Sequence, residues 1–420
     1  MLSPTRGSVR DMGSATDLRF IVLQPGARMS YAVPALLARA GMLERFYTDI
    51  CADVGLLRYL GPIWPDRMRP RPVARLLGRQ LPPEIMPSVV RQVPFSSFAD
   101  QALRRFPNGR RYLDGWTAPD PRLIELVRRD GFAGANALYT VLINSDVDLV
   151  REAQARGIRT VHEVMIGPDV GRWVREEQSL FPGIEQSVLP ARIREGNERD
   201  ALKYERSDLI LVPSEFVRRS VLELGADPRK IAAVPYGLDE WWLDQVNEPV
   251  PGRVLFVGSV GLRKGSHYLA EASRILAQRR AECEVRVVGP YRSDVIRHAA
   301  FKGPTYVGQV PRSRIGDEFR RADVFVLPTL CDSFALVHLE AMACGVPVIT
   351  TPNCGAVVRD GIDGFIVPIR DAAAIADKVE LLLTDRALRD RMGASARERA
   401  REFSWERYGQ RLLSALERLA

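Results

Sequence analysis

Residues 323–351 read DVFVLPTLCDSFALVHLEAMACGVPVITT and contain one complete strand–helix–strand unit. An apolar strand at 324–327 runs into a short loop, and the helix that follows ends at Gly345, with Pro347 just beyond it. Glycine just past a helix and proline soon after form a common stop signal. A second apolar strand follows at 348–351. This spacing predicts a βαβ unit of a parallel sheet.

Two acids in this unit suggest a ligand site. Glu340 is a carboxylate in an otherwise apolar helix, FALVHLEAMA, and a buried acid without a partner is costly. Asp332 stands eight positions earlier, just before the helix. The backbone N–H groups of the first turn, Phe334 to Val337, have no intrahelical acceptor and form an anion site beside it. A sugar nucleotide, with hydroxyls at both ends and phosphate in the middle, would suit this arrangement. Alternatively, Asp332 is only an N-cap and Glu340 lies on a partly exposed face.

The bulk composition is that of a globular protein with room for two or three domains. The chain has 420 residues, of which 46% are hydrophobic, and its five cysteines show no CxxC pairing. This cysteine usage favours a reducing compartment and argues against a zinc site. No apolar run reaches the roughly 18 residues that span a bilayer. Residues 1–16 lack an apolar signal core and are expected to be a disordered lead-in. We therefore expect a cytoplasmic protein.

The net charge of +8 is concentrated in one stretch. Residues 58–111 hold eleven arginines against three acids, together with many prolines and several large apolar residues. Basic residues mixed with exposed apolar ones suit peripheral contact with an anionic membrane, here the inner face of the cell membrane. A solvated cluster of loops and helices is an equally good interpretation. No recognised nucleic-acid-binding module is present, so we expect no nucleic-acid partner.

The first half of the chain alternates strands and helices, which is typical of a doubly wound α/β domain. Its expected strands lie at 18–23, 137–143, 160–164, 208–213 and 231–235. Helices are expected at 32–40 and 197–206, and after Ser214, which would cap the helix EFVRRSVLELG. The Arg/Pro-rich stretch interrupts this pattern as an insertion. The N-terminal domain should occupy 17–240.

A second α/β series follows a linker with two prolines and a glycine, placed at 241–252. It begins with the strand RVLFVG and continues with the helix SHYLAEASRILAQ, the strands CEVRVVG and TYVGQV, and the helix RSRIGDEFRR. This C-terminal domain should occupy 253–400. The last segment, 401–420, is predicted to be an amphipathic packing helix.

A glycine-rich loop and one histidine are further candidates. Gly258 to Gly265, GSVGLRKG, follows a strand and precedes a helix, so Lys264 or Arg263 could neutralise a diphosphate there. The order of residues is not that of a Walker A loop. Gly289 also lies just beyond a strand end. His162 ends the strand TVHE, although a lone histidine is more often structural than catalytic. No cluster has metal-ligand spacing.

The sequence resembles the retaining glycosyltransferases of family four, glycosyl transferases group 1, over residues 207–405. The motifs that carry the resemblance are SDLILVPSEFVRRSVLELGADPRKIAAVPYGLD (207–239), VLFVGSVGLRKG (254–265), VRVVGP (285–290), YVGQV (306–310), DSFALVHLEAMACGVPVITTPNCGAVVRDGIDGFIVP (332–368) and the closing FSW. The first domain matches far less clearly. The resemblance implies the GT-B fold, in which two Rossmann-like doubly wound domains face each other across a cleft and a C-terminal helix packs back on the first domain.

The resemblance also implies a function and the residues that perform it. It implies a metal-independent transferase without a cofactor, which moves a sugar from a nucleotide-sugar donor to a hydroxyl of a sugar, glycolipid or other acceptor, as in surface polysaccharide or glycolipid synthesis. Glu340 matches the acid on the ribose, Asp332 the acid that contacts the donor sugar, and Lys264 the lysine on the leaving diphosphate. His162 matches the histidine near the reacting sugar. The implied donor-binding set is Gly258, Ser259, Arg263, Lys264, Gly289, Asp332, Ser333, Phe334, Ala335, Leu336 and Glu340.

Four departures from the family pattern leave the activity open. Asp332 is one methylene shorter than the usual glutamate, Ala335 replaces a usual glycine, and Ser259 stands where an arginine often binds phosphate. Arg263 or Arg28 would have to substitute for that arginine. The glycine-rich loop that usually follows the first strand is replaced by QPGARMSYAVP (24–34). A non-catalytic sugar-nucleotide-binding protein and a GT-B sugar-nucleotide epimerase are the alternative functions.

Overall fold

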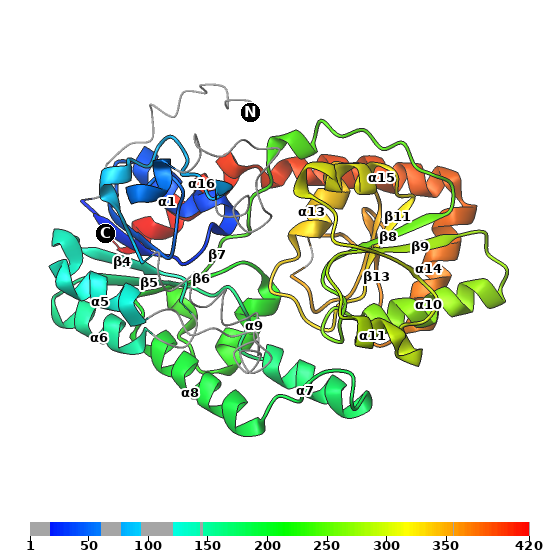
Figure 1. Ribbon diagram of the computed structural model, residues 1–420, viewed down its shortest axis with the longest axis horizontal. Coiled ribbons are helices and arrows are strands. Elements are labelled where there is room, and N and C mark those ends of the chain that lie inside the picture. The colour runs from blue at the N-terminus through cyan, green and yellow to red at the C-terminus, as the bar shows by residue number, and fades with distance from the viewer. Residues whose placement is uncertain (1–16, 60–76, 94–120, 143–145, 356, 420) are drawn as a thin grey trace. The chain divides into compact units, whose positions relative to one another are not determined.

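Strands and helices alternate along the chain in a computed structural model that describes residues 17–59, 77–93, 121–142, 146–355 and 357–419 (Figure 1). The expected lead-in at 1–16 lies outside these residues, as does most of the Arg/Pro-rich stretch at 58–111. The strands are β1 (Phe20–Leu23), β2 (Leu43–Thr48), β3 (Val90–Gln92), β4 (Ala137–Thr140), β5 (Arg159–Glu163), β6 (Leu209–Val212), β7 (Ile231–Ala233), β8 (Arg253–Val257), β9 (Glu284–Val288), β10 (Thr305–Gly308), β11 (Val324–Leu327), β12 (Val348–Thr350) and β13 (Gly364–Ile366).

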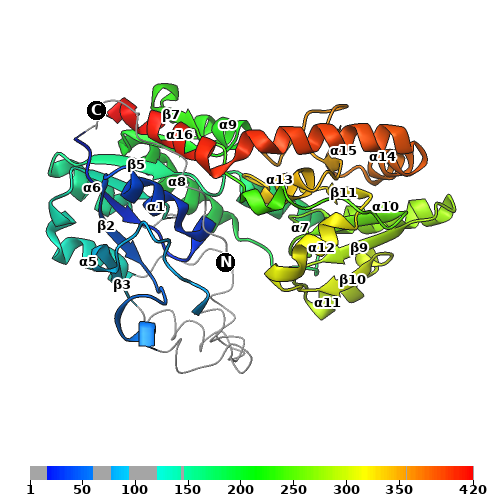
Figure 2. The same cartoon turned by 90° about the horizontal axis from the view of Figure 1, so that it is seen from above.

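The α-helices connect these strands and extend the C-terminal end of the chain. They are α1 (Ala32–Arg39), α5 (Pro121–Arg129), α6 (Val147–Ala155), α7 (Val170–Leu180), α8 (Pro190–Arg206), α9 (Glu215–Glu223), α10 (Ser266–Gln278), α11 (Ser293–Arg297), α12 (Ile315–Arg320), α13 (Leu336–Ala343), α14 (Ala372–Thr384), α15 (Arg386–Ala400) and α16 (Trp405–Leu416). Figure 2 shows α14, α15 and α16 following one another in orange and red.

Most of the predicted elements lie close to their expected positions. The helix α10 and the strand β11 have the predicted bounds, and the Ser214 hydroxyl caps α9 by accepting from the Val217 N–H. The charged helix expected at 197–206 is longer, because α8 begins at Pro190, a residue well suited to a first helical turn. The sequence analysis did not predict β2, β13, α5, α7, α14 and α15.

Both sheets have the doubly wound order that the sequence predicted. The hydrogen-bonded order of the described strands is β3-β2-β1-β4-β5-β6-β7 in one sheet and β10-β9-β8-β11-β12-β13 in the other. The registers of the second sheet are all parallel. Its direction of winding reverses between β8 and β11, and open α/β sheets bind ligands beyond the carboxyl ends of the strands at such a point.

Helices cover both faces of the second sheet. The helix α10 packs against α14 on one face, and α13 packs against α15 on the other. Figure 1 shows the strands between these two pairs of helices. The strands β8, β11 and β12 are buried almost throughout, which is expected when helices lie on both faces of a parallel sheet.

The chain forms two compact units that do not coincide with the two sheets. One unit takes the described residues up to Tyr139, together with Ala153–Thr160 and the C-terminal residues from Leu416, and the other takes Thr140–Glu152 and Val161–Ala415. The second unit therefore contains the end of β5, all of β6 and β7, and the whole second sheet. All of the predicted site residues lie in it.

The C-terminal helix packs on the segment that follows β7, as predicted. In α16, the Trp405 Nε1–H donates to Asp239 Oδ1 at 2.6 Å, and the Tyr408 ring lies against Tyr236. Gly237 is needed here, because a Cβ atom at this position would lie 2.5 Å from the indole ring of Trp405. The contact explains why a small residue stands in the stretch PYGLD.

Candidate functional site

Two loops meet at the reversal point of the second sheet and carry most of the predicted site residues. One follows β8 and leads into α10, and the other follows β11 and leads into α13. The Leu330 N–H donates to the Arg263 carbonyl at 2.9 Å, and the Thr329 hydroxyl donates to the same oxygen at 3.0 Å. These bonds hold the two loops side by side.

Glycines make this close approach sterically possible. A Cβ atom at Gly265, where φ is 65°, would lie 1.8 Å from the Pro328 carbonyl oxygen. A Cβ atom at Gly289 would lie 1.9 Å from the carbonyl oxygen of Gly258. No side chain fits at either position. Gly258 and Gly289 therefore bring the ends of β8 and β9 together, and the neighbouring Ser259 is exposed.

Lys264 and Asp332 form an ion pair between the two loops. The Lys264 Nζ donates to Asp332 Oδ2, and each side chain is 15% exposed. The Arg263 guanidinium lies 4.0 Å from the same carboxylate oxygen and donates to the Cys331 carbonyl at 3.2 Å. Burial alone would raise the pKa of Asp332, but Lys264 and Arg263 outweigh it and hold that pKa below its usual range. Asp332 is thus ionised beside two cations.

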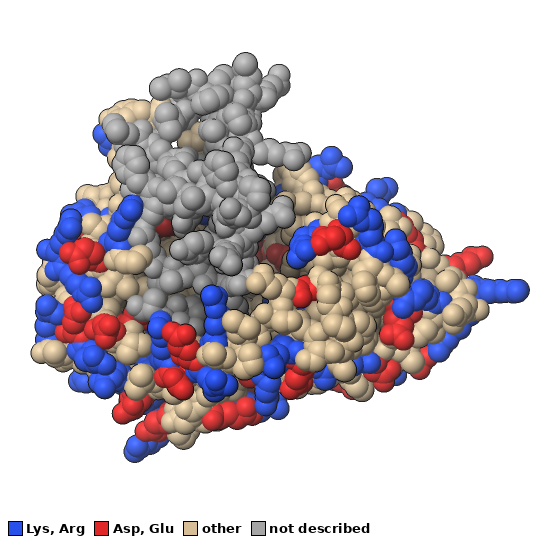
Figure 3. Space-filling view, turned by 60° about the horizontal axis from the view of Figure 1, so that its bottom comes forward, with Lys and Arg blue, Asp and Glu red and all other residues tan. Residues whose placement is uncertain are grey.

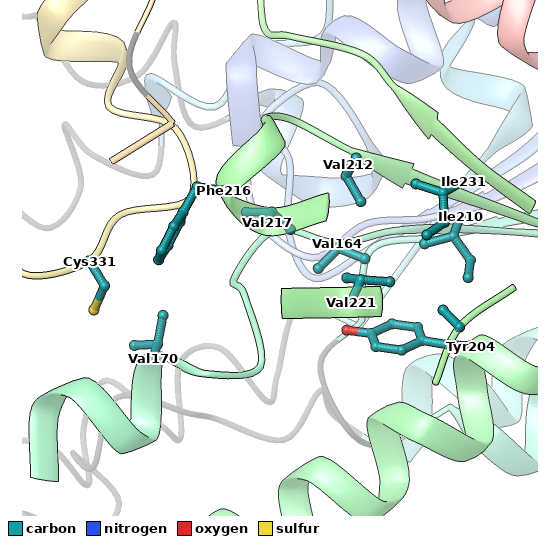
Figure 4. Close-up of a cluster of buried hydrophobic side chains, with 11 residues drawn as sticks. Val164, Val170, Tyr204, Ile210, Val212, Phe216, Val217, Val221, Ile231 and Cys331 are labelled. Atoms are coloured by element: carbon teal, nitrogen blue, oxygen red, sulfur yellow. The ribbon is translucent and has the colours of Figure 1, made fainter. Parts of the chain in front are cut away.

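Residues of the first half of the chain hold the loop that contains Asp332 in place. The Gly167 N–H donates to the Ser333 hydroxyl at 3.0 Å, and the Ser214 hydroxyl donates to the Ser333 carbonyl at 2.7 Å. Cys331 lies in a buried apolar cluster that includes Val170 and Phe216 (Figure 4). Ser333, predicted to bind the donor, is thus seen here as an anchor of this loop.

The helix after this loop begins two residues later than the sequence suggested. The first residue of α13 is Leu336, and Ala335 stands at its N-cap without a side-chain hydrogen bond. Asp332 is therefore not an N-cap, and that alternative was wrong, because its carboxylate binds Lys264. Phe334 is buried, with its ring edge-on to Tyr236 at 5.2 Å between centroids.

Glu340 lies one turn inside α13 and is half-buried. Its carboxylate makes no hydrogen bond to any described residue. Burial raises its pKa to about 7, with a further rise from Asp239 and an opposing effect of Arg312. An acid without a partner beside a helix start is a plain candidate for accepting ligand hydroxyls.

His162 is buried at the carboxyl end of β5, and only 4% of it is exposed. Its ring stacks on the Tyr204 ring, with 5.9 Å between the centroids. Burial and the Lys203 charge hold its pKa well below the usual value, so the imidazole is neutral. Its Nδ1 has no hydrogen-bond partner among the described residues.

The structure therefore brings together Lys264, Arg263, Asp332 and Ser333, and it places Glu340 along the same helix that begins beyond them. Among the described residues, no hydrogen bond or ion pair joins His162 to this group. Tyr236 lies between neighbours of the two: its hydroxyl donates to Glu163 Oε1 at 3.0 Å, next to His162 in the sequence, and its ring lies against Phe334. Tyr236 was not predicted, and a lone tyrosine in PYGLD gave no signal.

A second network that the sequence analysis missed attaches α7 to α10. Glu177 is fully buried and accepts from Tyr268 at 2.6 Å and from Arg370 at 2.8 Å, and it lies 2.7 Å from His267. Burial raises the pKa of Glu177, but these hydrogen bonds outweigh it and lower that pKa. Such an acid within the polar stretch VREEQS cannot be told from a surface charge by its sequence.

The same segment also reaches the glycine-rich loop. The Leu262 N–H donates to Glu185 Oε1 at 2.9 Å, in the residues just after α7. The loop that carries Arg263 and Lys264 is therefore braced at its centre.

Two further observations on the described residues concern membrane-spanning helices and metal sites. No described helix combines the length and apolarity needed to cross a bilayer. In the described residues, no three His, Cys, Asp or Glu side chains gather in a way that would hold a metal ion.

Comparison with solved structures shows that this arrangement is the GT-B fold. Sucrose-phosphate synthase from Thermosynechococcus elongatus superposes with a TM-score of 0.65 at 19% identity, over 96% of this chain and 99% of that one. Anabaena HepE in complex with UDP-glucose superposes with a TM-score of 0.62 at 14% identity, over 95% and 99%.

Residues 244–399 match the family Glycosyl transferases group 1. Among curated proteins, the D-inositol 3-phosphate glycosyltransferase of Kineococcus radiotolerans is 29% identical over 242 residues, which is 48% of this chain and 55% of that protein. The corresponding protein of Geodermatophilus obscurus is 32% identical over 246 residues, or 50% and 52%. The chain thus matches about half the length of these relatives.

Proposed function

We propose that this protein is a glycosyltransferase that moves a sugar from a nucleotide-sugar donor to a hydroxyl acceptor, with retention of the anomeric configuration. The observation that carries the proposal is the ion pair of Lys264 with Asp332 at the reversal point of the second sheet, with the unpartnered Glu340 one turn inside the adjoining helix. A cation, an acid and a second acid in this order fit the diphosphate, the sugar and the ribose of a nucleotide-sugar.

The donor would replace internal contacts of the free protein. Lys264 would leave Asp332 for the diphosphate, and Asp332 would then accept from a hydroxyl of the donor sugar. Glu340 would accept from the ribose hydroxyls. The N–H groups around Ala335 and Leu336, at the start of α13, would add the positive end of the helix dipole near the phosphates.

Arg263 would compensate for the serine at position 259. Its guanidinium already lies 4.0 Å from Asp332, so it is close to the position that Lys264 would take on the phosphates. Two cations that are preorganised at the leaving group stabilise its developing charge without a metal ion. We therefore propose a metal-independent reaction, which should proceed unchanged in a chelating buffer.

His162 would act next to the reacting sugar as a neutral imidazole. Since the described residues offer no evident nucleophile there, we propose that the acceptor hydroxyl attacks from the face that the diphosphate leaves, without a covalent enzyme intermediate. The anomeric proton coupling of the product, measured by NMR, would reveal retention or inversion.

The names of the relatives suggest where to start with substrates. UDP-glucose is bound by HepE, and inositol phosphate is the acceptor in the names of the curated relatives. We propose a UDP- or GDP-sugar donor and a polar hydroxyl acceptor, either a phosphorylated polyol or the head of a glycolipid. All five cysteines are free thiols, as befits the cytoplasmic location that we propose.

We further propose that the Arg/Pro-rich stretch at 58–111 contacts anionic membrane. Most of it lies outside the described residues. On the face shown in Figure 3, acidic and basic side chains of the described residues are interspersed. In the sequence, this stretch holds eleven arginines against three acids. Sedimentation with anionic liposomes at low salt, and release at high salt, would support the contact.

A thermal-shift panel of UDP, GDP, ADP and their common sugars tests the site. A rise in melting temperature with one base is expected from binding to the folded state. The shift should disappear in Glu340→Gln and persist in Glu271→Gln, which alters an exposed acid on α10. With the donor that the panel identifies, the wild type should then transfer the sugar to an acceptor.

The panel also separates the alternatives. A shift without transfer to any acceptor would favour a sugar-nucleotide-binding protein, and conversion of the donor alone would favour an epimerase. If no nucleotide shifts the melting temperature, the proposal fails.

A further inference from the structure

Arg263 and Lys264 occupy the two central positions of a tight turn between β8 and α10. The Gly265 N–H donates to the Leu262 carbonyl at 2.9 Å, which closes the turn over four residues. The two cations thus share one short piece of backbone, and any shift of this turn moves both of them. The position of the Lys264 ammonium group therefore depends on how Leu262 is held.

Two neighbouring residues of a distant segment, between α7 and α8, hold Leu262. Glu185 Oε1 accepts from the Leu262 N–H at 2.9 Å, across a separation of 77 positions in the sequence. The Leu262 side chain is fully buried in the same apolar cluster as Ile184. A hydrogen bond to a carboxylate is about twice as strong as one to a neutral acceptor. Both the backbone and the side chain of Leu262 are therefore fixed by this segment.

Gly261 leaves the space that the Glu185 carboxylate needs. A Cβ atom at position 261 would lie 2.5 Å from Glu185 Oε1. The Ser266 hydroxyl accepts from the Gly261 N–H and donates to the Gly261 carbonyl, each at 3.0 Å. The N–H groups of residues 261 and 262 are therefore both bonded to side chains, which fixes the entry to the turn.

The segment that carries Glu185 is itself held in place, although much of it is exposed. The buried Gln178 side chain donates to the Gln186 carbonyl at 2.8 Å and accepts from the Val188 N–H at 2.9 Å. Glu177, one residue earlier on α7, binds the first turn of α10. The helix α7 therefore anchors both the loop that supplies the carboxylate and the helix that follows the turn.

The hydrogen bond from Leu262 adds a direction that apolar packing does not supply. Burial of the Leu262 side chain favours any orientation of the turn that keeps this side chain covered, because the hydrophobic effect is non-directional. An N–H···O bond, in contrast, weakens steeply when it bends. The Glu185 carboxylate therefore selects one orientation of the turn, from which the Lys264 side chain reaches Asp332 in the adjoining loop.

We propose that Glu185 is a positioning residue for Lys264: its bond to the Leu262 N–H sets the turn from which the ammonium group reaches the leaving diphosphate. Glu185 itself is assigned no contact with substrate. The inference rests on the proposed function in one respect, namely that Lys264 stabilises the diphosphate during sugar transfer. A brace that serves only the fold would affect stability, whereas a positioning residue must act through Lys264.

Three variants of the full-length protein test the contact itself. Glu185→Ala removes the acceptor, Glu185→Gln keeps an oxygen that can accept from the same N–H, and Gly261→Ala places a methyl group against the carboxylate. Hydrogen exchange in peptides covering 258–266, measured by mass spectrometry, should become at least about tenfold faster in Glu185→Ala and Gly261→Ala. It should stay near the wild-type rate in Glu185→Gln and in the control Gln186→Ala, which alters an exposed neighbouring side chain.

The kinetic arm measures sugar transfer with the donor that the thermal-shift panel identifies. Since misplacing a reacting group by about 1 Å can cost about 10²-fold, kcat should fall by roughly tenfold in Glu185→Ala and Gly261→Ala. The donor KM should stay within about threefold, because Glu340 and the start of α13 are untouched. Glu185→Gln should keep at least about a third of the wild-type kcat, because its acceptor is weaker but has the same geometry. Gln186→Ala should leave kcat unchanged.

A double-mutant cycle determines whether Glu185 acts through Lys264. In the Lys264→Met background, Glu185→Ala should lower kcat by less than about twofold, because the position of an absent ammonium group has no effect. The same cycle applies to the affinity for UDP and GDP, measured by isothermal titration. The free diphosphate carries the charge that the leaving group acquires, so Glu185→Ala should weaken its binding by about tenfold with Lys264 present and by less than about twofold without it.

The outcomes separate this inference from the proposed function. Unchanged kcat in folded Glu185→Ala, or a loss of about tenfold that persists without Lys264, would overturn the positioning role and leave Glu185 as a structural brace. If UDP or GDP binds with the expected coupling but the wild type transfers no sugar to any acceptor, the positioning of Lys264 is upheld and the proposed function fails. Should Glu185→Ala not fold, Gly261→Ala displaces the same carboxylate and carries every readout.

Discussion

The two lysine–aspartate pairs have the same chemistry but different access to water. The side chains of Lys264 and Asp332 are each 15% exposed, whereas those of Lys203 and Asp146 are fully buried. A pair at the surface of a site can exchange its partner for an anionic ligand. A fully buried pair cannot open without leaving a charge in an apolar interior. The first pair is therefore suited to bind and release a ligand, and the second to hold a fixed geometry.

The strongest test of this comparison removes the lysine of each pair and measures the free energy of unfolding. Lys203→Met should lower the free energy of unfolding by about 3–5 kcal/mol, since it strands the Asp146 carboxylate in the interior. Lys264→Met should lower it by less than about 1 kcal/mol, because Asp332 can be hydrated and keeps Arg263 nearby. Urea unfolding followed by circular dichroism gives both values.

The added substitution Asp146→Leu should recover most of the stability lost in Lys203→Met. Equal losses in the two single lysine variants would show that the pairs do not differ as their burial suggests.

For the rate of sugar transfer, the two lysine variants should rank in the opposite order. Lys264→Met should reduce kcat for sugar transfer by about 10²–10³-fold, or about 2.7–4 kcal/mol, because one preorganised charge at the leaving diphosphate is lost. The exposed Lys302 provides the control, and Lys302→Met should be neutral. Steady-state rates at saturating donor are the measurement. A decrease of less than about threefold would mean that Arg263 alone is sufficient at the leaving group.

The fold and the two loops at the reversal point of the second sheet were predictable from the sequence because each depends on local pattern. The strand β11, the stop at Gly345 and the loop ending in Lys264-Gly265 are written in consecutive residues, and the structure keeps them. The acid at Glu340 was conspicuous because its neighbours are apolar. Asp332 was ambiguous between a cap and a binding acid; the structure excludes the cap and pairs Asp332 with a residue 68 positions away.

What escaped prediction depends on contacts between distant segments. Glu177 and Lys203 both lie in helices rich in exposed charges, so nothing local marks them as buried. The helix α15 has a narrow apolar stripe among many charged residues, and its packing on α13 is a tertiary property. Tyr236 contacts Glu163, Phe334 and Tyr408, which are all distant from it in the sequence.

A smaller effect tests whether the Lys264–Asp332 pair must open. Asp332→Asn removes the charge that competes with phosphate for Lys264, so the affinity for the free nucleoside diphosphate should increase by about tenfold, or 1.4 kcal/mol. Transfer should nevertheless slow, because the sugar loses its acceptor for a hydroxyl hydrogen bond. Isothermal titration with the diphosphate, beside a transfer assay, measures both. Weaker diphosphate binding in this variant would indicate that the pair stays closed around the ligand.

The smallest effect concerns Glu340, whose carboxylate makes no hydrogen bond or ion pair among the described residues. The pKa of Glu340 is raised by burial from its usual 4.5 to about 7, so the contribution of its carboxyl to stability is complete below pH 4.5 and lost as the pH rises through 7. Compared with Glu340→Gln, the wild type should thus lose about 1–3 °C of melting temperature between pH 5 and 8. Glu271→Gln should follow the wild type at every pH.

Nucleotide binding should have the opposite pH dependence. Ribose hydroxyls donate to the ionised carboxylate, so the affinity for the nucleotide should rise between pH 5 and 8 in the wild type and stay flat in Glu340→Gln. If Glu340 served only in packing, the stability of the protein would still fall as the pH rises, but the affinity for the nucleotide would not change. Ionisation of Glu340 should therefore lower the stability of the free protein and raise its affinity for the nucleotide. These opposite pH dependences are expected only if Glu340 accepts hydrogen bonds from ligand hydroxyls, so they are the decisive observation for this residue.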